Sequence, residues 1–108
     1  AYRLSDGAIT PWTTEGYASH TSARNTQNRA LGVFTSQFPN PPIDRPYAGQ
    51  GLIVRPGSVT VAVPSLGWTG DINDYWAQPH MAPSPNGDYV TWAKKVGSEL
   101  QAWVRRLA

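Results

Sequence analysis

The chain of 108 residues contains no cysteine. Disulfides, thiolate metal sites and cysteine nucleophiles are therefore excluded together, and a small secreted scaffold is disfavoured because such domains usually depend on disulfides. Histidine is also scarce, with His20 and His80 sixty residues apart. That separation lacks the H-x-x-x-H spacing of a zinc helix. We predict no metal and no cofactor.

Charged residues make up only 15% of the chain, against an average near 25%. Low charge combined with many aromatic residues argues against a disordered chain. The net charge of +2 belongs to the C-terminal segment, where Lys94, Lys95, Arg105 and Arg106 outnumber Glu99. Nucleic-acid binders usually carry a stronger basic stripe. We therefore interpret the polar run over residues 24–29 as a solvated helix face, and we do not expect nucleic acid as a partner.

Long apolar runs are absent as well. No stretch approaches the eighteen residues of a membrane span and no signal peptide is visible, so we expect no membrane partner. The chain begins at Ala1 without Met, which is compatible with loss of an initiator, processing or excision. A virion or cytoplasmic location is favoured.

Motifs for catalysis are missing too. The chain has no G-x-S-x-G elbow, and Gly49-Gln50-Gly51 is not followed by a third glycine or by a phosphate-binding lysine. An EF-hand loop starting at Asp71 fails, because Trp76 stands where glycine is needed. We therefore predict no catalytic residues and no enzyme. A small hydrolase using His20 or His80 is the third-ranked alternative.

Proline and glycine, in contrast, are abundant, with ten of each. Residues 38–47 (FPNPPIDRPY) hold four prolines and predict an extended strap anchored by Phe38 and Tyr47. Residues 1–20 predict an extended arm that could include a short strand. Residues 21–31 predict a short helix that is capped by Thr21 or Ser22 and stopped by Gly32. Residues 1–50 should therefore be largely irregular.

The clearest strand signal lies in residues 51–64 (GLIVRPGSVTVAVP). A two-residue turn at Pro56-Gly57 places Val54 opposite Val59 and Leu52 opposite Val61. One face then carries the apolar residues Leu52, Val54, Val59, Val61 and Val63, which favours a hairpin with one buried face. Against this, Pro-Gly prefers a type II turn, whose twist does not match that of antiparallel strands.

Residues 88–107 predict an amphipathic helix. Steps of three and four residues align its apolar positions, as a core-facing helix requires; these are Tyr89, Val90, Trp92, Ala93, Val96, Leu100, Trp103, Val104 and Leu107. Gly97 would cost about 1 kcal/mol in that helix. The predicted fold is α+β in one domain: residues 1–50 form the arm, short helix and strap, and residues 51–108 form a small antiparallel sheet, an aromatic loop and the C-terminal helix.

The aromatic loop over residues 67–80 (GWTGDINDYWAQPH) admits two interpretations. Trp68, Tyr75 and Trp76 beside Asp71 could bind a sugar ring and its hydroxyls. The preferred interpretation is that Asp71 caps a single helical turn, while Tyr75 and Trp76 pack inward.

Aromatic residues in the first fifty positions, such as Trp12 and Tyr17, lie in segments with little periodic structure. Such segments tend to become ordered by docking, and interfaces favour aromatic residues and Arg over Lys. We therefore predict a non-enzymatic structural or interaction protein, a subunit of a larger protein assembly such as a virion component (phage capsid-accessory or head–tail protein). The candidate binding residues are Trp12, Tyr17, Trp68, Asp71, Tyr75 and Trp76. A carbohydrate-binding module using loop 67–80 is the second alternative.

Overall fold

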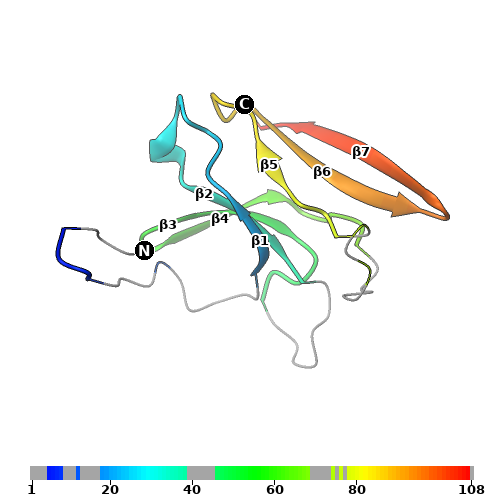
Figure 1. Cartoon of the computed structure of the whole chain (residues 1–108), viewed down its shortest axis with the longest axis horizontal. Helices are drawn as coiled ribbons and strands as arrows, with labels where there is room; N and C mark the ends of the chain where they lie inside the picture. The colour runs from blue at the N-terminus through cyan, green and yellow to red at the C-terminus, as the bar shows by residue number, and fades with distance from the viewer. Residues whose placement is uncertain are drawn as a thin grey trace.

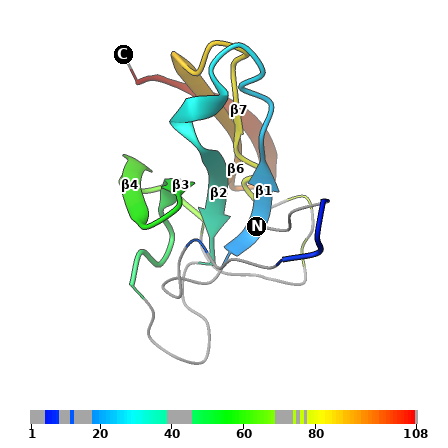
Figure 2. The same ribbon diagram turned by 90° about the vertical axis from the view of Figure 1, so that its left-hand side faces the viewer.

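The computed structural model describes residues 5–8, 12, 18–38, 46–68, 74, 76 and 78–107. These residues build two antiparallel sheets (Figure 1). In the first sheet the strand order is β1 (Ala18–Ser22), β2 (Val33–Gln37), β3 (Gly51–Arg55) and β4 (Ser58–Val63). Figure 2 shows these four strands side by side. The second sheet has the order β5 (Ala82–Pro83), β6 (Tyr89–Val96) and β7 (Glu99–Arg106).

The predicted α+β class is wrong. No α-helix occurs within the described ranges, where 3-10 conformation is found in η1 (Arg29–Leu31) and at Trp76, so the fold is nearly all β. Residues 88–107, predicted as an amphipathic helix, form the β6–β7 hairpin, with Trp92 opposite Trp103 and Val96 opposite Glu99. The two sheets, and not a sheet and a helix, enclose the core.

The β6–β7 hairpin forms because its sequence suits strands better than a helix. β6 is rich in β-branched and aromatic residues, including Val90, Thr91 and Trp92, which pack well on a pleated surface. Gly97 has φ of 61°, while Ser98 has no positive φ. This combination at the two central positions is that of a type II′ turn, whose twist matches antiparallel strands. Gly97 therefore closes a hairpin and does not weaken a helix.

The short helix predicted over residues 21–31 is also wrong. Residues 18–22 form β1, turns follow, and only Arg29–Leu31 is helical. The buried side chain of Asn25 donates to the carbonyl oxygens of Asn28 and Gly32 at 2.8 and 3.0 Å. These bonds stabilise a loop, because asparagine side chains compete with helical backbone hydrogen bonds. Gly32 does end η1, with φ of 116°.

The expectation of a largely irregular N-terminal half is wrong for residues 18–37, which supply β1 and β2. Most of the predicted arm over residues 1–20 lies outside the described residues. So do residues 39–45 of the proline-rich strap. At the end of that strap, Tyr47 has φ of 67°.

The register predicted for the hairpin of residues 51–64 is confirmed. Leu52 pairs with Val61 and Val54 with Val59, around the turn at Pro56-Gly57. Gly57 has φ of 69°, so the non-primed turn is tolerated here. The prediction of one buried face is wrong: Val61 is 40% exposed, whereas Ile53 and Ala62, on the opposite side, are buried.

The core joins the two sheets. Its central cluster takes residues from both, namely Phe34, Ile53, Ala62, Val63, Leu66, Met81, Val90 and Trp92. Two hydrogen bonds reinforce this junction. The Met81 backbone N–H donates to Ser36 Oγ at 3.1 Å, and Trp92 Nε1 donates to the Leu66 carbonyl oxygen at 3.0 Å. The core thereby fixes the base of the β6–β7 hairpin against the first sheet.

Candidate interaction surface on the β6–β7 hairpin

The outer edge of β7 is open. β7 is the last strand of its sheet, and no described strand pairs with its far side. The Leu107 backbone N–H donates to the Asp88 carbonyl oxygen at 2.7 Å, which shows that odd-numbered residues of β7 hydrogen-bond to β6. Because antiparallel pairs alternate, the even-numbered residues direct their backbone N–H and C=O groups outward. These residues are Leu100, Ala102, Val104 and Arg106.

The opposite edge of β6 is covered. The Ala93 backbone N–H donates to the Pro79 carbonyl oxygen at 2.7 Å, and the Ser84 N–H donates to the Tyr89 carbonyl oxygen at 2.8 Å. Odd-numbered residues of β6 therefore bond toward the segment that contains β5. The open edge of this sheet is the one on β7.

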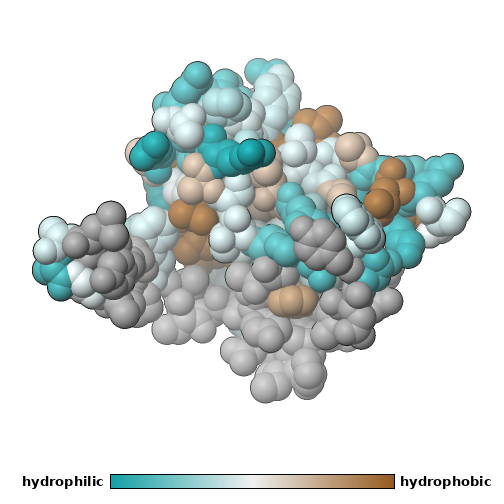
Figure 3. All heavy atoms as spheres, viewed as in Figure 1, coloured by the Kyte–Doolittle hydropathy of each residue, from teal (hydrophilic) through white to brown (hydrophobic). Residues whose placement is uncertain are grey.

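Exposed apolar side chains gather on the same hairpin. Val104 is 65% exposed and Leu100 is 52% exposed. They share one face with Ala102 and Arg106 on β7 and with Tyr89, Thr91, Ala93 and Lys95 on β6, because directly paired residues lie on the same side of a sheet. Figure 3 shows apolar atoms beside strongly hydrophilic ones at the end of the molecule that carries the hairpin. We call the face formed by these eight residues the outer face.

The inner face of the hairpin carries an ordered aromatic group. The rings of Trp92 and Trp103 lie 6.3 Å apart, and Lys94 Nζ lies 4.5 Å from the centre of the Trp103 ring. Trp103 Nε1 donates to Gln101 Oε1 at 3.1 Å. Although Trp103 is 40% exposed, these contacts hold its ring in place.

An open groove of about 420 Å³ separates the inner face from the end of β4. Its walls come from both sheets: Val63, Pro64, Ser65 and Leu66 on one side, and Trp92, Lys94, Trp103, Val104 and Arg105 on the other. The hairpin therefore offers apolar surface on both faces as well as a free backbone edge.

The structure assigns different environments to the predicted residues of loop 67–80. Trp68 is 8% exposed and its ring lies 5.1 Å from that of Phe38, so it belongs to the core. Trp76 is 70% exposed, so the preferred prediction that its side chain packs inward is wrong. The carbohydrate alternative thus loses one of its three rings to the core and stays a prediction that depends on Tyr75 and Trp76. Asp71 and Tyr75, with the predicted cap, lie outside the described residues.

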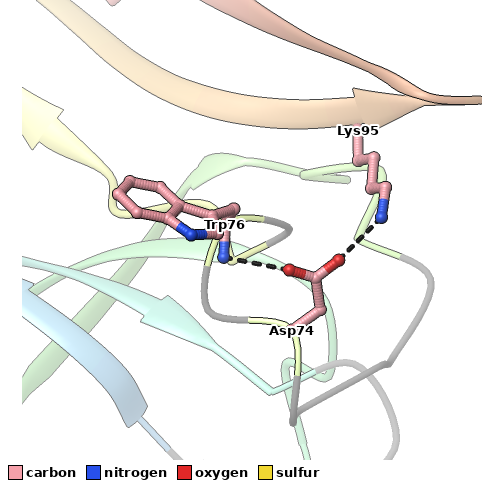
Figure 4. Close-up of polar contacts among 3 residues, drawn as sticks. All are labelled: Asp74, Trp76 and Lys95. Carbon is pink, nitrogen blue, oxygen red and sulfur yellow. Dashed lines mark hydrogen bonds and ion pairs between the residues drawn. The ribbon is translucent and has the colours of Figure 1, made fainter.

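Asp74 connects this loop to β6. Its Oδ2 atom lies 2.7 Å from Lys95 Nζ, and its Oδ1 atom accepts the Trp76 backbone N–H at 3.2 Å (Figure 4). In Figure 4 the Trp76 ring points away from this ion pair. Asp74 therefore holds the backbone beside an exposed ring.

Of the two predicted aromatic residues near the N-terminus, Trp12 is half-buried, and its carbonyl oxygen accepts the Gly57 N–H at 3.3 Å. Trp12 thus lies at the β3–β4 turn. Tyr17 is outside the described residues. Neither Trp12 nor Trp68 contributes to the hairpin surface, whose exposed members were not among the six predicted residues.

The two histidines, sixty residues apart in sequence, are stacked. Their ring centroids lie 3.9 Å apart, and His20 Nε2 hydrogen-bonds Gln78 Oε1. In the part of the chain that the structure describes, no group of three or more His, Cys, Asp or Glu residues could hold a metal ion. In the polar run over residues 24–29, Asn25 is buried and unavailable to a ligand.

No helix among the described residues is long and apolar enough to cross a membrane. Comparisons with protein-family models, with curated proteins and with solved structures find no match.

Proposed function

We propose that this protein is a non-enzymatic subunit of a larger protein assembly and that the β6–β7 hairpin is its main contact surface. The observation that carries the proposal is the coincidence, on β7, of an open backbone edge with the exposed side chains of Leu100, Trp103 and Val104. Backbone hydrogen bonds and apolar contacts can then be made by the same strand.

The absence of protection along β7 supports this proposal. Exposed edge strands are prone to unwanted pairing, and proteins usually shield them with proline, bulges or charged residues. β7 contains no proline, and its pairing with β6 shows no register shift. Its charged residues stand only at the ends, as Glu99, Arg105 and Arg106. A strand of this kind is expected where a partner covers the edge.

A virion component, such as a phage capsid-accessory or head–tail protein, is the assembly that we favour. This preference rests on architecture alone, because the chain is small, lacks cysteine and presents a projecting hairpin.

The test is site-specific cross-linking. A photoreactive phenylalanine analogue replaces Val104 in the full chain, which is expressed in its native cells and irradiated. We expect one dominant protein adduct of defined mass, because Val104 would lie inside the interface. The adduct should disappear when Ala102→Pro is added, since proline removes an outward N–H while the bonds from β7 to β6 remain.

The matched control carries the same analogue at Thr26, which is exposed in the loop between β1 and β2. It should give no dominant adduct. An absence of any protein adduct at position 104, or equal adducts at both positions, would show that the hairpin is not an assembly surface.

A further inference from the structure

We propose that the partner of β7 is β7 of a second copy of this chain, paired antiparallel about a two-fold axis that passes midway between the two Ala102 residues. This inference rests on the proposed function, since it names the occupant of the same surface. Three features of β7 support this pairing: the alternation of its outward backbone groups, the charges at its two ends and its outer position in the fold.

The alternation of outward-facing and β6-facing residues along β7 restricts the registers in which a second strand can pair with it. Only Leu100, Ala102, Val104 and Arg106 direct backbone groups outward, as the Leu107-to-Asp88 hydrogen bond establishes. In an antiparallel pair, residues that exchange hydrogen bonds must both face the partner strand. Even-numbered residues of one copy must therefore oppose even-numbered residues of the other.

The Ala102-centred register makes the strand complementary to itself. Ala102 then opposes its own counterpart, and Leu100 opposes Val104 of the second copy, which joins apolar side chains on the outer face. On the inner face, Glu99 opposes Arg105 of the second copy. Two-fold symmetry repeats each of these contacts, so the dimer contains two Leu–Val pairs and two Glu–Arg pairs.

The neighbouring permitted registers lack this complementarity. With the axis between the two Gln101 residues, Glu99 would oppose Trp103. With the axis between the two Trp103 residues, Gln101 would oppose Arg105, and Leu100 would oppose Arg106. Both shifts remove the two opposite-charge pairs, and both replace the Leu100–Val104 contact. The charges at the ends of β7 thus select one register.

The place of the hairpin in the fold leaves room for this pairing. Figure 1 shows β6 and β7 extending away from the four-stranded sheet, with β7 on the outer side. A second hairpin at the normal spacing of about 4.8 Å would continue the sheet from three strands to six. Ala102, the residue beside the axis, has a small side chain that permits the close approach.

The experiment uses two charge reversals, Glu99→Lys and Arg105→Glu, in the full chain. Each variant alone places like charges opposite each other twice in the dimer, so each should raise the dimer dissociation constant about tenfold or more, measured by sedimentation equilibrium. An equimolar mixture of the two variants should associate as tightly as the wild type, because a mixed pair restores both opposite-charge contacts.

Recovery of association in the mixture would show that Glu99 and Arg105 interact between two chains and not within one chain. Glu99 and Arg105 are six positions apart on the same strand, or about 20 Å, and cannot compensate for each other there. Arg106→Glu is the matched control: it makes the same charge change next to Arg105, but its opposite residue is the uncharged Ser98, so its effect should be clearly smaller. Far-ultraviolet circular dichroism checks that every variant folds.

A wild-type chain that stays monomeric at millimolar concentration would overturn the inference, as would two variants that do not recover on mixing. The cross-link at position 104 separates this failure from failure of the proposed function. An adduct with a different protein would leave the assembly role standing with another partner. No adduct at all would remove both.

Discussion

At the scale of single residues, Asn25 is a buried polar group on which the loop between β1 and β2 depends. Its amide nitrogen donates to two carbonyl oxygens, those of Asn28 and Gly32. Asn25→Ala should lower the free energy of unfolding by about 2 kcal/mol, because both carbonyls lose their donor. Asn25→Asp should cost more, since a carboxylate would face two carbonyl oxygens. Urea unfolding midpoints measure both effects.

Asn28 provides the control, because its backbone carbonyl takes part in this arrangement while its side chain belongs to an exposed residue. Asn28→Ala should change stability by less than about 0.5 kcal/mol. Equal losses for the two alanine variants would contradict the role assigned to the Asn25 side chain.

Asp74 and Lys95 give a second prediction at this scale. Asp74→Asn removes the charge from the 2.7 Å ion pair but leaves Oδ1 to accept the Trp76 N–H. Because both partners are partly exposed, the coupling energy should be only about 0.5 kcal/mol and should fall as salt is added. A double-mutant cycle with Lys95→Gln measures it. Coupling that is independent of salt would argue against an ion pair.

At the scale of elements, the turn at Gly97-Ser98 determines whether residues 88–107 form a hairpin. Nothing lies within 4 Å of a Cβ built on Gly97, so the cost of a side chain there comes from its φ of 61°. Gly97→Ala should lower stability by about 1 kcal/mol, and Gly97→Asn should cost less, because asparagine tolerates this conformation better. Thermal unfolding measures the difference, with Ser98→Ala as the control expected to be near neutral.

The two hairpins also show what the sequence could and could not reveal. For β3–β4, strict alternation around Pro56-Gly57 allowed the correct register to be predicted. For β6–β7, apolar steps of three and four residues coexist with a period of two, so the apolar pattern alone fits a helix as well as a hairpin. The Gly97-Ser98 pair and the β-branched residues of β6 are the local signals that favour the strands.

The candidate site was harder to predict from the sequence than the β3–β4 hairpin. Exposure of Leu100 and Val104 follows from the lack of a covering element beside β7 among the described residues, and no local sequence pattern encodes that lack. The stacking of His20 on His80 likewise depends on tertiary contacts between distant segments. Trp68 was predicted as a binding residue because it is aromatic, and the structure places it in the core.

At the scale of the whole molecule, the open edge predicts an alternating pattern of amide hydrogen exchange along β7. In the monomer, Leu100, Ala102 and Val104 should exchange rapidly, while Gln101, Trp103 and Arg105, bonded to β6, should be protected. Raising the protein concentration should protect the first group and leave the second little changed. Residue-resolved hydrogen exchange at two protein concentrations measures this. Uniform protection along β7 would contradict the assignment of its even-numbered residues to the open edge.

The strand order has a consequence for the kinetics of folding. Every pairing between described strands joins strands that are consecutive in sequence: β1 to β2, β2 to β3, β3 to β4, β5 to β6 and β6 to β7. The tight hairpins at Gly57 and Gly97 can form without closing a long loop, whereas contacts between Phe34 and the second sheet span much of the chain. We therefore expect docking of two partly formed sheets, and not strand pairing, to limit the folding rate.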